Sequence, residues 1–155
     1  MHHEIELALK FGPSLNILEG AVALDLTERH LQNELKKAGH PWTLAKSFSE
    51  ACAVSAFFTI KNLDDLKDLP LRLWVGDELR QNGRTSQMIF DLPTLVDYVL
   101  SRFPVCPGDL LLTGTPAGVG PLRDGDQVKA QIEGMATHVW KVAKETPPAA
   151  RQECP

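Results

Sequence analysis

One stretch of sequence decides the fold: Leu110-Leu111-Leu112-Thr113-Gly114-Thr115-Pro116-Ala117-Gly118-Val119-Gly120. It begins as an apolar run with the length of a buried strand and stops in a loop of glycine, threonine and proline. Gly114 and Gly118 permit backbone angles that residues with a Cβ avoid, so another backbone or a ligand can come close. The hydroxyls of Thr113 and Thr115 beside free N–H groups suit a small anion such as a carboxylate. Two interpretations stay open, a tight turn between core strands and a ligand-binding loop.

The loop lacks the two common phosphate-binding motifs. A P-loop has Lys and then Ser or Thr after its last glycine, whereas Val119 follows Gly118 here. A dinucleotide pattern that starts at Gly118 and Gly120 needs a third glycine where the chain has Arg123. The sequence therefore disfavours a nucleotide-binding module.

The composition is that of an ordinary globular domain. The chain has 155 residues, of which 43% are hydrophobic and 23% charged, enough for one domain with a real core. The net charge of −4 argues against a nucleic-acid partner. No apolar run is long enough to span a bilayer, so no membrane partner is expected either. The three cysteines have no metal-ligand spacing, which favours reduced thiols in an intracellular protein.

Polar and apolar residues alternate from His3 to Leu9, which predicts a strand with two different faces. The period of two puts Glu4 and Glu6 on the same face. Two carboxylates this close repel each other unless one is protonated or a cation lies between them. Mg²⁺ prefers oxygen ligands of this kind. The alternative is a solvated strand face that carries two glutamates.

A lone carboxylate, Asp25, lies inside the next predicted strand, Glu19 to Leu26. A carboxylate in such an apolar run needs a partner. Thr27 is expected to cap the helix that follows. Arg29 and Gln32 are three residues apart and share one side of that helix, so they converge with Asp25 at the junction. The alternative is an ion pair between Asp25 and Arg29 that only orders the junction.

Lys46 lies between apolar residues in the segment from Trp42 to Phe48. A partly buried lysine can stabilise an anionic intermediate. The alternative is a lysine that buries its stem and keeps its charge in water.

The rest of the chain predicts short strands and one more helix. A strand is predicted at residues 53–60. A meander is predicted at residues 71–81, with one turn at Gly76-Asp77 and a second turn at Asn82-Gly83. A helix with Pro93 in its first turn follows. Its predicted core face consists of Leu95, Val96, Val99, Leu100 and Phe103. Strands are expected at 128–132 and 139–142. The pattern indicates an α+β fold with a mostly antiparallel or mixed sheet.

Five stretches in order resemble the fumarylacetoacetate hydrolase superfamily, and in particular its single-domain branch of acylpyruvate hydrolases and oxaloacetate decarboxylases. They are His2-His3-Glu4-Ile5-Glu6-Leu7, Leu24-Asp25-Leu26-Thr27 with Arg29 and Gln32, Pro41-Trp42-Thr43-Leu44-Ala45-Lys46-Ser47-Phe48, Thr85-Ser86-Gln87-Met88-Ile89-Phe90, and Leu112 to Gly120. The resemblance implies a mixed β-roll in a domain of residues 1–143 and a homodimer. The composition of the C-terminal end, which is rich in proline and alanine, predicts an unstructured tail at 144–155.

The resemblance also implies a site. The implied ligands of Mg²⁺ or Mn²⁺ are Glu4, Glu6 and Asp25. The implied substrate-binding residues are Arg29, Gln32, Lys46 and Thr115, of which Lys46, Gln32 and Arg29 are the catalytic candidates. The implied reactions are C–C bond cleavages of 2-oxoacids through a metal-bound enolate, namely acylpyruvate hydrolysis and oxaloacetate decarboxylation. The metal polarises the 2-oxo group and Lys46 supports the enolate. Family members in eukaryotes occur in mitochondria and cytosol, and no targeting segment is visible here.

Two departures from the family qualify this picture. Family members carry a segment before the strand with the two glutamates, and that segment holds strands of the roll and a lid with a water-activating His and Glu pair. Here Met1 directly precedes His2, and the interval from Glu6 to Asp25 is short. An N-terminally truncated member with an incomplete roll is therefore expected. The alternative function is a non-catalytic fragment that binds metal and 2-oxoacid or pairs with a full-length subunit.

Overall fold

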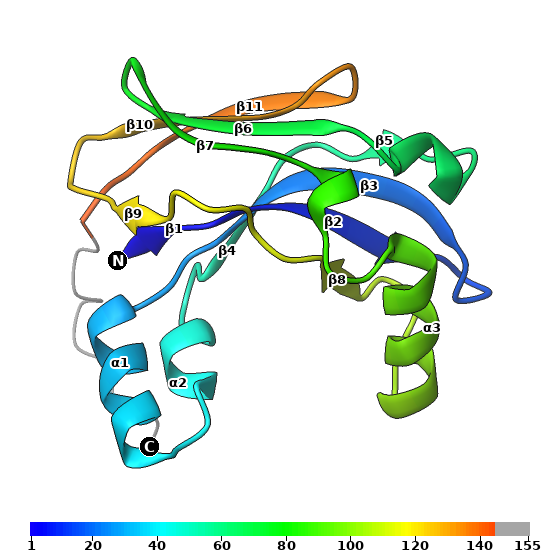
Figure 1. Ribbon diagram of the computed structural model, residues 1–155, viewed down its shortest axis with the longest axis horizontal. Helices are drawn as coiled ribbons and strands as arrows, with labels where there is room; N and C mark the ends of the chain where they lie inside the picture. The colour runs from blue at the N-terminus through cyan, green and yellow to red at the C-terminus, as the bar shows by residue number, and fades with distance from the viewer. Residues whose placement is uncertain (145–155) are drawn as a thin grey trace, which may run out of the picture.

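The computed structural model describes residues 1–144, in which two β-sheets lie one above the other (Figure 1). The first sheet has the order β11-β10-β6-β7 and contains β6 (Pro70–Val75), β7 (Glu78–Arg84), β10 (Gln127–Ile132) and β11 (Ala136–Lys141). The second has the order β4-β3-β2-β8 and contains β2 (Ile5–Phe11), β3 (Ile17–Asp25), β4 (Cys52–Val54) and β8 (Leu110–Leu112), with β5 (Phe58–Thr59) also paired to β3. A small ribbon pairs β1 (His2–His3) with β9 (Gly120–Pro121).

The helices lie at the two ends of the second sheet (Figure 1). They are α1 (Arg29–Ala38), α2 (Thr43–Lys46) and α3 (Leu92–Arg102), with single turns η1 (Leu63–Leu66) and η2 (Thr85–Gln87). Gly39 ends α1 in the left-handed conformation, and Asp91 caps α3 by accepting a hydrogen bond from the Thr94 amide, with a proline in the first turn. Every pairing between the strands of residues 1–144 is antiparallel. The predicted α+β roll is confirmed.

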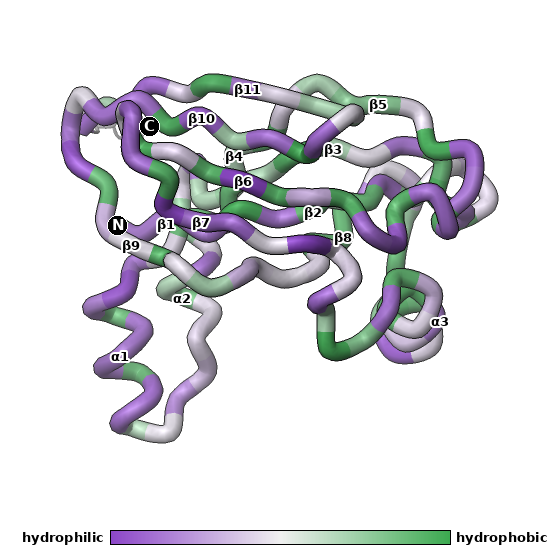
Figure 2. The backbone as a smooth tube through the Cα atoms, turned by 45° about the horizontal axis from the view of Figure 1, so that its top comes forward, coloured by the Kyte–Doolittle hydropathy of each residue, from purple (hydrophilic) through white to green (hydrophobic). Residues whose placement is uncertain are grey.

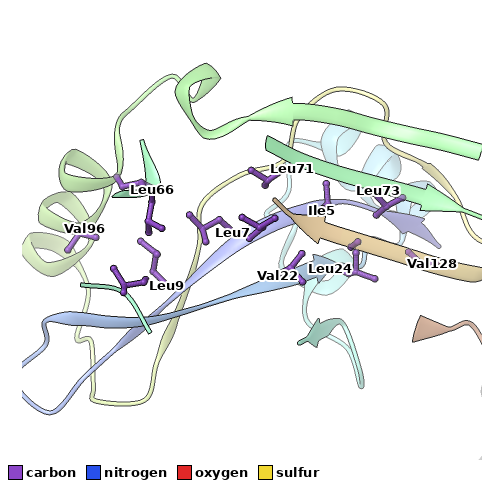
Figure 3. Close-up of a cluster of buried hydrophobic side chains, with 14 of the residues drawn as sticks. Ile5, Leu7, Leu9, Val22, Leu24, Leu66, Leu71, Leu73, Val96 and Val128 are labelled. Atoms are coloured by element: carbon purple, nitrogen blue, oxygen red, sulfur yellow. The ribbon is translucent and has the colours of Figure 1, made fainter. Parts of the chain in front are cut away.

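The hydrophobic core fills the space between the two sheets (Figure 3). Its central side chains are Ile5, Leu7, Leu9, Val22, Leu24, Leu71, Leu73 and Val128. The alternation that predicted the strands is visible as alternating colour along β6 and β10 in Figure 2. In β10, for example, Val128, Ala130 and Ile132 are buried while Gln127 and Lys129 are exposed.

The opposite face of the second sheet is lined by small residues. Ala8, Ala21 and Ala23 are fully buried there. Glu4 and Glu6 are only 7% and 4% exposed, so the alternative of a solvated glutamate face is wrong. The alanines leave room on this face, and the functional side chains lie beside them.

The turn predicted at Asn82-Gly83 is wrong. Both residues lie within β7, where they pair with Arg72 and Leu71 of β6. Gly83 is required for a different reason, because a Cβ there would lie 2.5 Å from the Cβ of Pro116 in the glycine-rich loop. The pairing of β7 with β6 therefore overrides the local turn preference. The absence of a side chain at Gly83 lets the glycine-rich loop pack closely against β7.

The structure also differs from three smaller predictions. The segment 53–60 forms two short strands, β4 and β5, instead of one. The core face of α3 is narrower than predicted, because Leu92 and Val96 are buried whereas Leu100 and Phe103 are 37% and 59% exposed. The run that begins at Leu110 is a half-buried edge strand, since β8 pairs with β2 and with no other strand of residues 1–144.

The remaining expectations concern other parts of the chain. Among the described residues, Cys52 and Cys106 are both exposed and form no disulfide. The predicted unstructured tail lies outside the described residues except for Lys144. Within residues 1–144, no helix combines the length and the apolar character that crossing a membrane requires.

Candidate metal centre

Strand register brings three carboxylates together. Glu6 lies opposite Ala23 and Ile5 opposite Leu24 in the antiparallel ladder of β2 and β3. Glu4 therefore falls beside Asp25, whose amide donates to the Glu4 carbonyl oxygen at 2.9 Å. Directly opposed residues share a face, so all three side chains project from the alanine-lined side of the sheet. One oxygen from each carboxylate lies within 4.8 Å of the others.

The ammonium of Lys46 bridges two of these carboxylates. Its Nζ lies 2.8 Å from Glu4 Oε2 and 2.5 Å from Asp25 Oδ2. Burial by itself lowers the pKa of Lys46, but the hydrogen bonds and charges of Asp25 and Glu4 outweigh it, so the pKa is raised. Lys46 is thus held as a cation inside the acidic cluster. The alternative, a lysine whose charge stays in water, is wrong.

Arg29 completes the charge pairing of Glu4. Its guanidinium donates to Glu4 Oε1, and Nη1 donates to Gln32 Oε1 at 2.6 Å. Burial raises the pKa of Glu4, but the Lys46 and Arg29 hydrogen bonds outweigh it and hold the pKa below its usual value. The alternative of an Asp25–Arg29 ion pair is wrong, because Asp25 pairs with Lys46 and Arg29 with Glu4.

Glu6 has no such compensation. Within residues 1–144 it forms no ion pair, and its side chain accepts one hydrogen bond, from the Gly114 amide at 2.6 Å. Burial, together with the charges of Asp25 and Glu4, raises the pKa of Glu6 to about 7. Among residues 1–144, Glu6 is therefore the one carboxyl of the cluster that is not ion-paired with a cation.

The donor set fits a hard divalent cation. Three carboxylates offer only oxygen atoms, which Mg²⁺ and Mn²⁺ prefer, and they converge closely enough to share one ion. A cation here would also supply the positive charge that Glu6 lacks. Glu4, Glu6 and Asp25 are thus the residues that would hold the metal, and their role as ligands stays a prediction.

Thr27 does not cap α1, contrary to expectation. The residue at the cap position is Glu28, which makes no capping hydrogen bond with its side chain. Thr27 is fully buried, and its hydroxyl lies 2.7 Å from Lys46 Nζ. Thr27 therefore holds the Lys46 ammonium by a hydrogen bond and does not cap α1.

The glycine-rich loop lies against the cluster on one side and β7 on the other. The Gly114 amide contacts Glu6, as described, while Thr115 Oγ1 lies 2.9 Å from Gln81 Nε2. Gly118 has φ +99°, and a Cβ there would lie 2.1 Å from the Arg80 carbonyl oxygen. The loop turns tightly and also reaches the acidic cluster, and ligand binding by the loop stays a prediction.

A cavity of about 660 Å³ is lined in part by this loop. Thr113, Thr115 and Met88 are among its wall residues, and the three carboxylates are not. Thr115 therefore borders this cavity, while its neighbour Gly114 contacts the acidic cluster.

The structure thus gathers six of the predicted site residues directly and attaches the seventh through the loop. The six are Glu4, Glu6, Asp25, Arg29, Gln32 and Lys46, and the seventh is Thr115. Sequence reasoning missed His3 and Gln81, which are both fully buried and hydrogen-bonded to each other at 3.0 Å. The local pattern gave no signal for Gln81, which falls in a mainly polar strand.

Comparison with known proteins shows which family the chain is similar to. A family model described as the fumarylacetoacetate hydrolase C-terminal domain matches residues 1–143. The human protein named oxaloacetate tautomerase FAHD1, mitochondrial, is 43% identical over 154 residues, covering 93% of this chain and 70% of the relative. Rice oxaloacetate tautomerase FAHD2, mitochondrial, is 42% identical, with 93% of this chain and 68% of the relative covered.

Solved structures agree with this similarity. A yeast fumarylacetoacetate hydrolase family protein superposes with a TM-score of 0.85 at 33% identity, covering 95% of this chain and 70% of the other. Fumarylpyruvate hydrolase from Pseudomonas aeruginosa was solved in complex with Mn²⁺ and pyruvate. It superposes with a TM-score of 0.86 at 29% identity, covering 93% of this chain and 66% of the hydrolase.

Proposed function

Because the chain belongs to the fumarylacetoacetate hydrolase family, we propose that it is a divalent-metal-dependent enzyme that converts small 2-oxoacids through their enolates. Oxaloacetate is the proposed substrate for tautomerisation and decarboxylation, and acylpyruvates are the proposed substrates for hydrolysis. These reactions share one feature, because each places an electron pair on C3 that is delocalised onto the 2-oxo oxygen. A site that stabilises this oxygen as an anion serves all of them.

The arrangement of Lys46 carries the proposal. Its ammonium is held among Glu4 and Asp25, and its raised pKa keeps it protonated at neutral pH. An ammonium fixed before the substrate arrives needs no reorganisation when negative charge develops on the 2-oxo oxygen. A metal held by the three carboxylates would supply Lewis-acid polarisation of the same 2-oxo group.

The neighbouring residues are proposed to bind the substrate. Gln32 accepts from Arg29 through its carbonyl oxygen, which leaves its amide nitrogen as the end that donates to a ligand. Thr115 offers a hydroxyl at the tip of the glycine-rich loop, where it suits the substrate carboxylate. The 2-oxoacid is thereby oriented by donors, as an anion requires.

The names of the relatives support one further part of the proposal, the location. The human and rice proteins are named as mitochondrial, which favours a mitochondrial location here, with the cytosol as the alternative. A homodimer remains the proposed assembly. The domain boundary near residue 143 and the tail after it also stay predictions.

The decisive experiment measures metal binding and turnover together. Thermal unfolding of the purified chain should shift upward with Mg²⁺ or Mn²⁺, because the cation binds the folded carboxylates and not the unfolded chain. Asp25→Asn should abolish the shift, whereas Asp97→Asn on the exposed face of α3 should retain it. Oxaloacetate loss, pyruvate formation and acetylpyruvate cleavage are then followed with each metal.

Lys46→Met separates catalysis from metal binding. It removes a competing cation from Glu4 and Asp25, so Mg²⁺ affinity should not fall, while oxalate affinity and kcat for oxaloacetate should drop roughly 10²-fold or more. Equal metal shifts in wild type and Asp25→Asn would disprove the metal site. Metal and oxalate binding without turnover would instead support the non-catalytic alternative.

A further inference from the structure

Gln81 links the first sheet to the loop that carries Thr115. It is fully buried, and both ends of its side-chain amide are hydrogen-bonded. Oε1 lies 3.0 Å from the Ile5 amide nitrogen and 3.0 Å from His3 Nδ1. Nε2 lies 2.9 Å from Thr115 Oγ1 and 2.9 Å from the Pro116 carbonyl oxygen.

The orientation of this amide is determined at both ends. A backbone N–H only donates, so the atom facing Ile5 must be the amide oxygen. A backbone carbonyl only accepts, so the atom facing Pro116 must be the nitrogen. No flipped orientation satisfies either contact.

The polarity of the Thr115 hydroxyl follows from that orientation. Gln81 Nε2 donates to Thr115 Oγ1, so the hydroxyl accepts in this contact and keeps its own proton for another acceptor. We propose that Gln81 is a positioning residue that holds the Thr115 hydroxyl as a donor toward the carboxylate of a bound 2-oxoacid. This inference rests on the function proposed above, since it acts through Thr115, which that proposal assigns to substrate binding.

The position of the loop does not depend on Gln81 alone. The Gly114 amide is hydrogen-bonded to Glu6, and Gly118 packs against the Arg80 carbonyl. Loss of the Gln81–Thr115 contact therefore leaves two other attachments in place. The specific contribution of Gln81 is the direction in which the hydroxyl donates.

Gln81→Glu tests this direction with almost no change of shape. A carboxylate in place of the amide still accepts from Ile5 but can no longer donate to Thr115 or to the Pro116 carbonyl oxygen, and it accepts the Thr115 hydroxyl proton instead. With Mn²⁺ saturating, oxalate affinity measured by calorimetry should fall roughly tenfold or more, the size expected for a hydrogen bond to a charged group. Mn²⁺ affinity should stay within about twofold, because Gln81 contacts none of the three carboxylates.

A double-mutant cycle separates positioning from general damage. Thr115→Val should weaken oxalate to a similar extent and Thr115→Ser should not, because serine keeps the hydroxyl. In the Thr115→Val background, Gln81→Glu should add less than about twofold, since no hydroxyl remains to be oriented. An additive loss there, or unchanged oxalate affinity in the single variant, would overturn the role of Gln81. Failure of the wild type itself to bind oxalate would overturn the proposed function and this inference together.

A measurement on the wild type covers the case in which Gln81→Glu does not fold. In the Mg²⁺-loaded chain, both side-chain amide protons of Gln81 should exchange with solvent more slowly by NMR than those of the exposed Gln127. Thr115→Val should speed the exchange of one of the two protons and leave the other protected by Pro116. Exchange at Gln81 as fast as at Gln127 would overturn the proposal.

Discussion

At the scale of single residues, Glu6 carries the strongest pH dependence of the acidic cluster. Burial raises its pKa from 4.5 to about 7 in the folded chain. Between these values the unfolded chain has lost the proton that the folded chain keeps, so stability falls as pH rises through this window. The shift corresponds to roughly 3 kcal/mol. Glu6→Gln should remove this dependence, and urea unfolding at pH 5, 6, 7 and 8 measures it.

His2 and His3 change stability with pH in the direction opposite to Glu6, so wild type must be compared with Glu6→Gln at each pH. Burial lowers the pKa of His2 and His3 below 6.5, so the unfolded chain binds more protons there and stability rises with pH up to about that value. The informative quantity is therefore the difference between wild type and Glu6→Gln. Saturating Mg²⁺ should abolish the Glu6 contribution, because a bound cation favours the carboxylate. A wild-type minus variant difference that is constant from pH 5 to 8 would contradict the raised pKa.

At the scale of elements, the loop between β8 and β9 is held by the close approach of Gly118 to β7. A Cβ at this position would meet the Arg80 carbonyl oxygen at 2.1 Å, and φ is +99°. Gly118→Ala should therefore destabilise the fold by about 2 kcal/mol or more and weaken oxalate binding, since the loop must move away from β7. Gly125→Ala is the matched control, because it has φ +87° and open space. Chemical unfolding and oxalate calorimetry compare the two, and equal effects would contradict the contact.

The strands and their faces were predictable, while their partners were not. Residues 3–9 and 128–132 alternate because each strand buries one face against the other sheet, and that pattern is local. The same period of two placed Glu4 and Glu6 together. The Asn82-Gly83 preference was misleading, because β6 and the loop impose a strand there through contacts distant in sequence.

The sequence also did not show which cation of the site pairs with which carboxylate. Lys46 lies 42 residues from Glu4 along the chain and 21 from Asp25, so only the register of β2, β3 and α2 decides which cation meets which carboxylate. A spacing rule within α1 correctly paired Arg29 with Gln32. It gave the wrong partner for Asp25, since a junction brings several cations within reach. Family resemblance supplied Lys46 and Thr115 where local patterns left alternatives.

At the scale of the whole molecule, the second sheet carries core packing on one face and the candidate metal ligands on the other. One face packs Leu7 and Leu24 into the core against Leu73 and Val128 of the first sheet. The other carries the carboxylates beside small alanines. Substitutions on opposite faces share no direct partners, so their effects on unfolding and on metal binding should be independent.

This independence can be tested with Leu73→Ala, a fully buried side chain between the sheets (Figure 3). Removing it should lower the free energy of unfolding by about 2–5 kcal/mol through lost burial and the cavity left behind. The Mn²⁺ dissociation constant should stay within about twofold of wild type, measured by calorimetry well below the melting temperature. Val139→Ala, at a 54% exposed position of β11, should change stability by less than about 0.5 kcal/mol. If Leu73→Ala instead weakens Mn²⁺ tenfold, the two faces are mechanically coupled, and the acidic cluster depends on the packing between the sheets as well as on the register of β2 and β3.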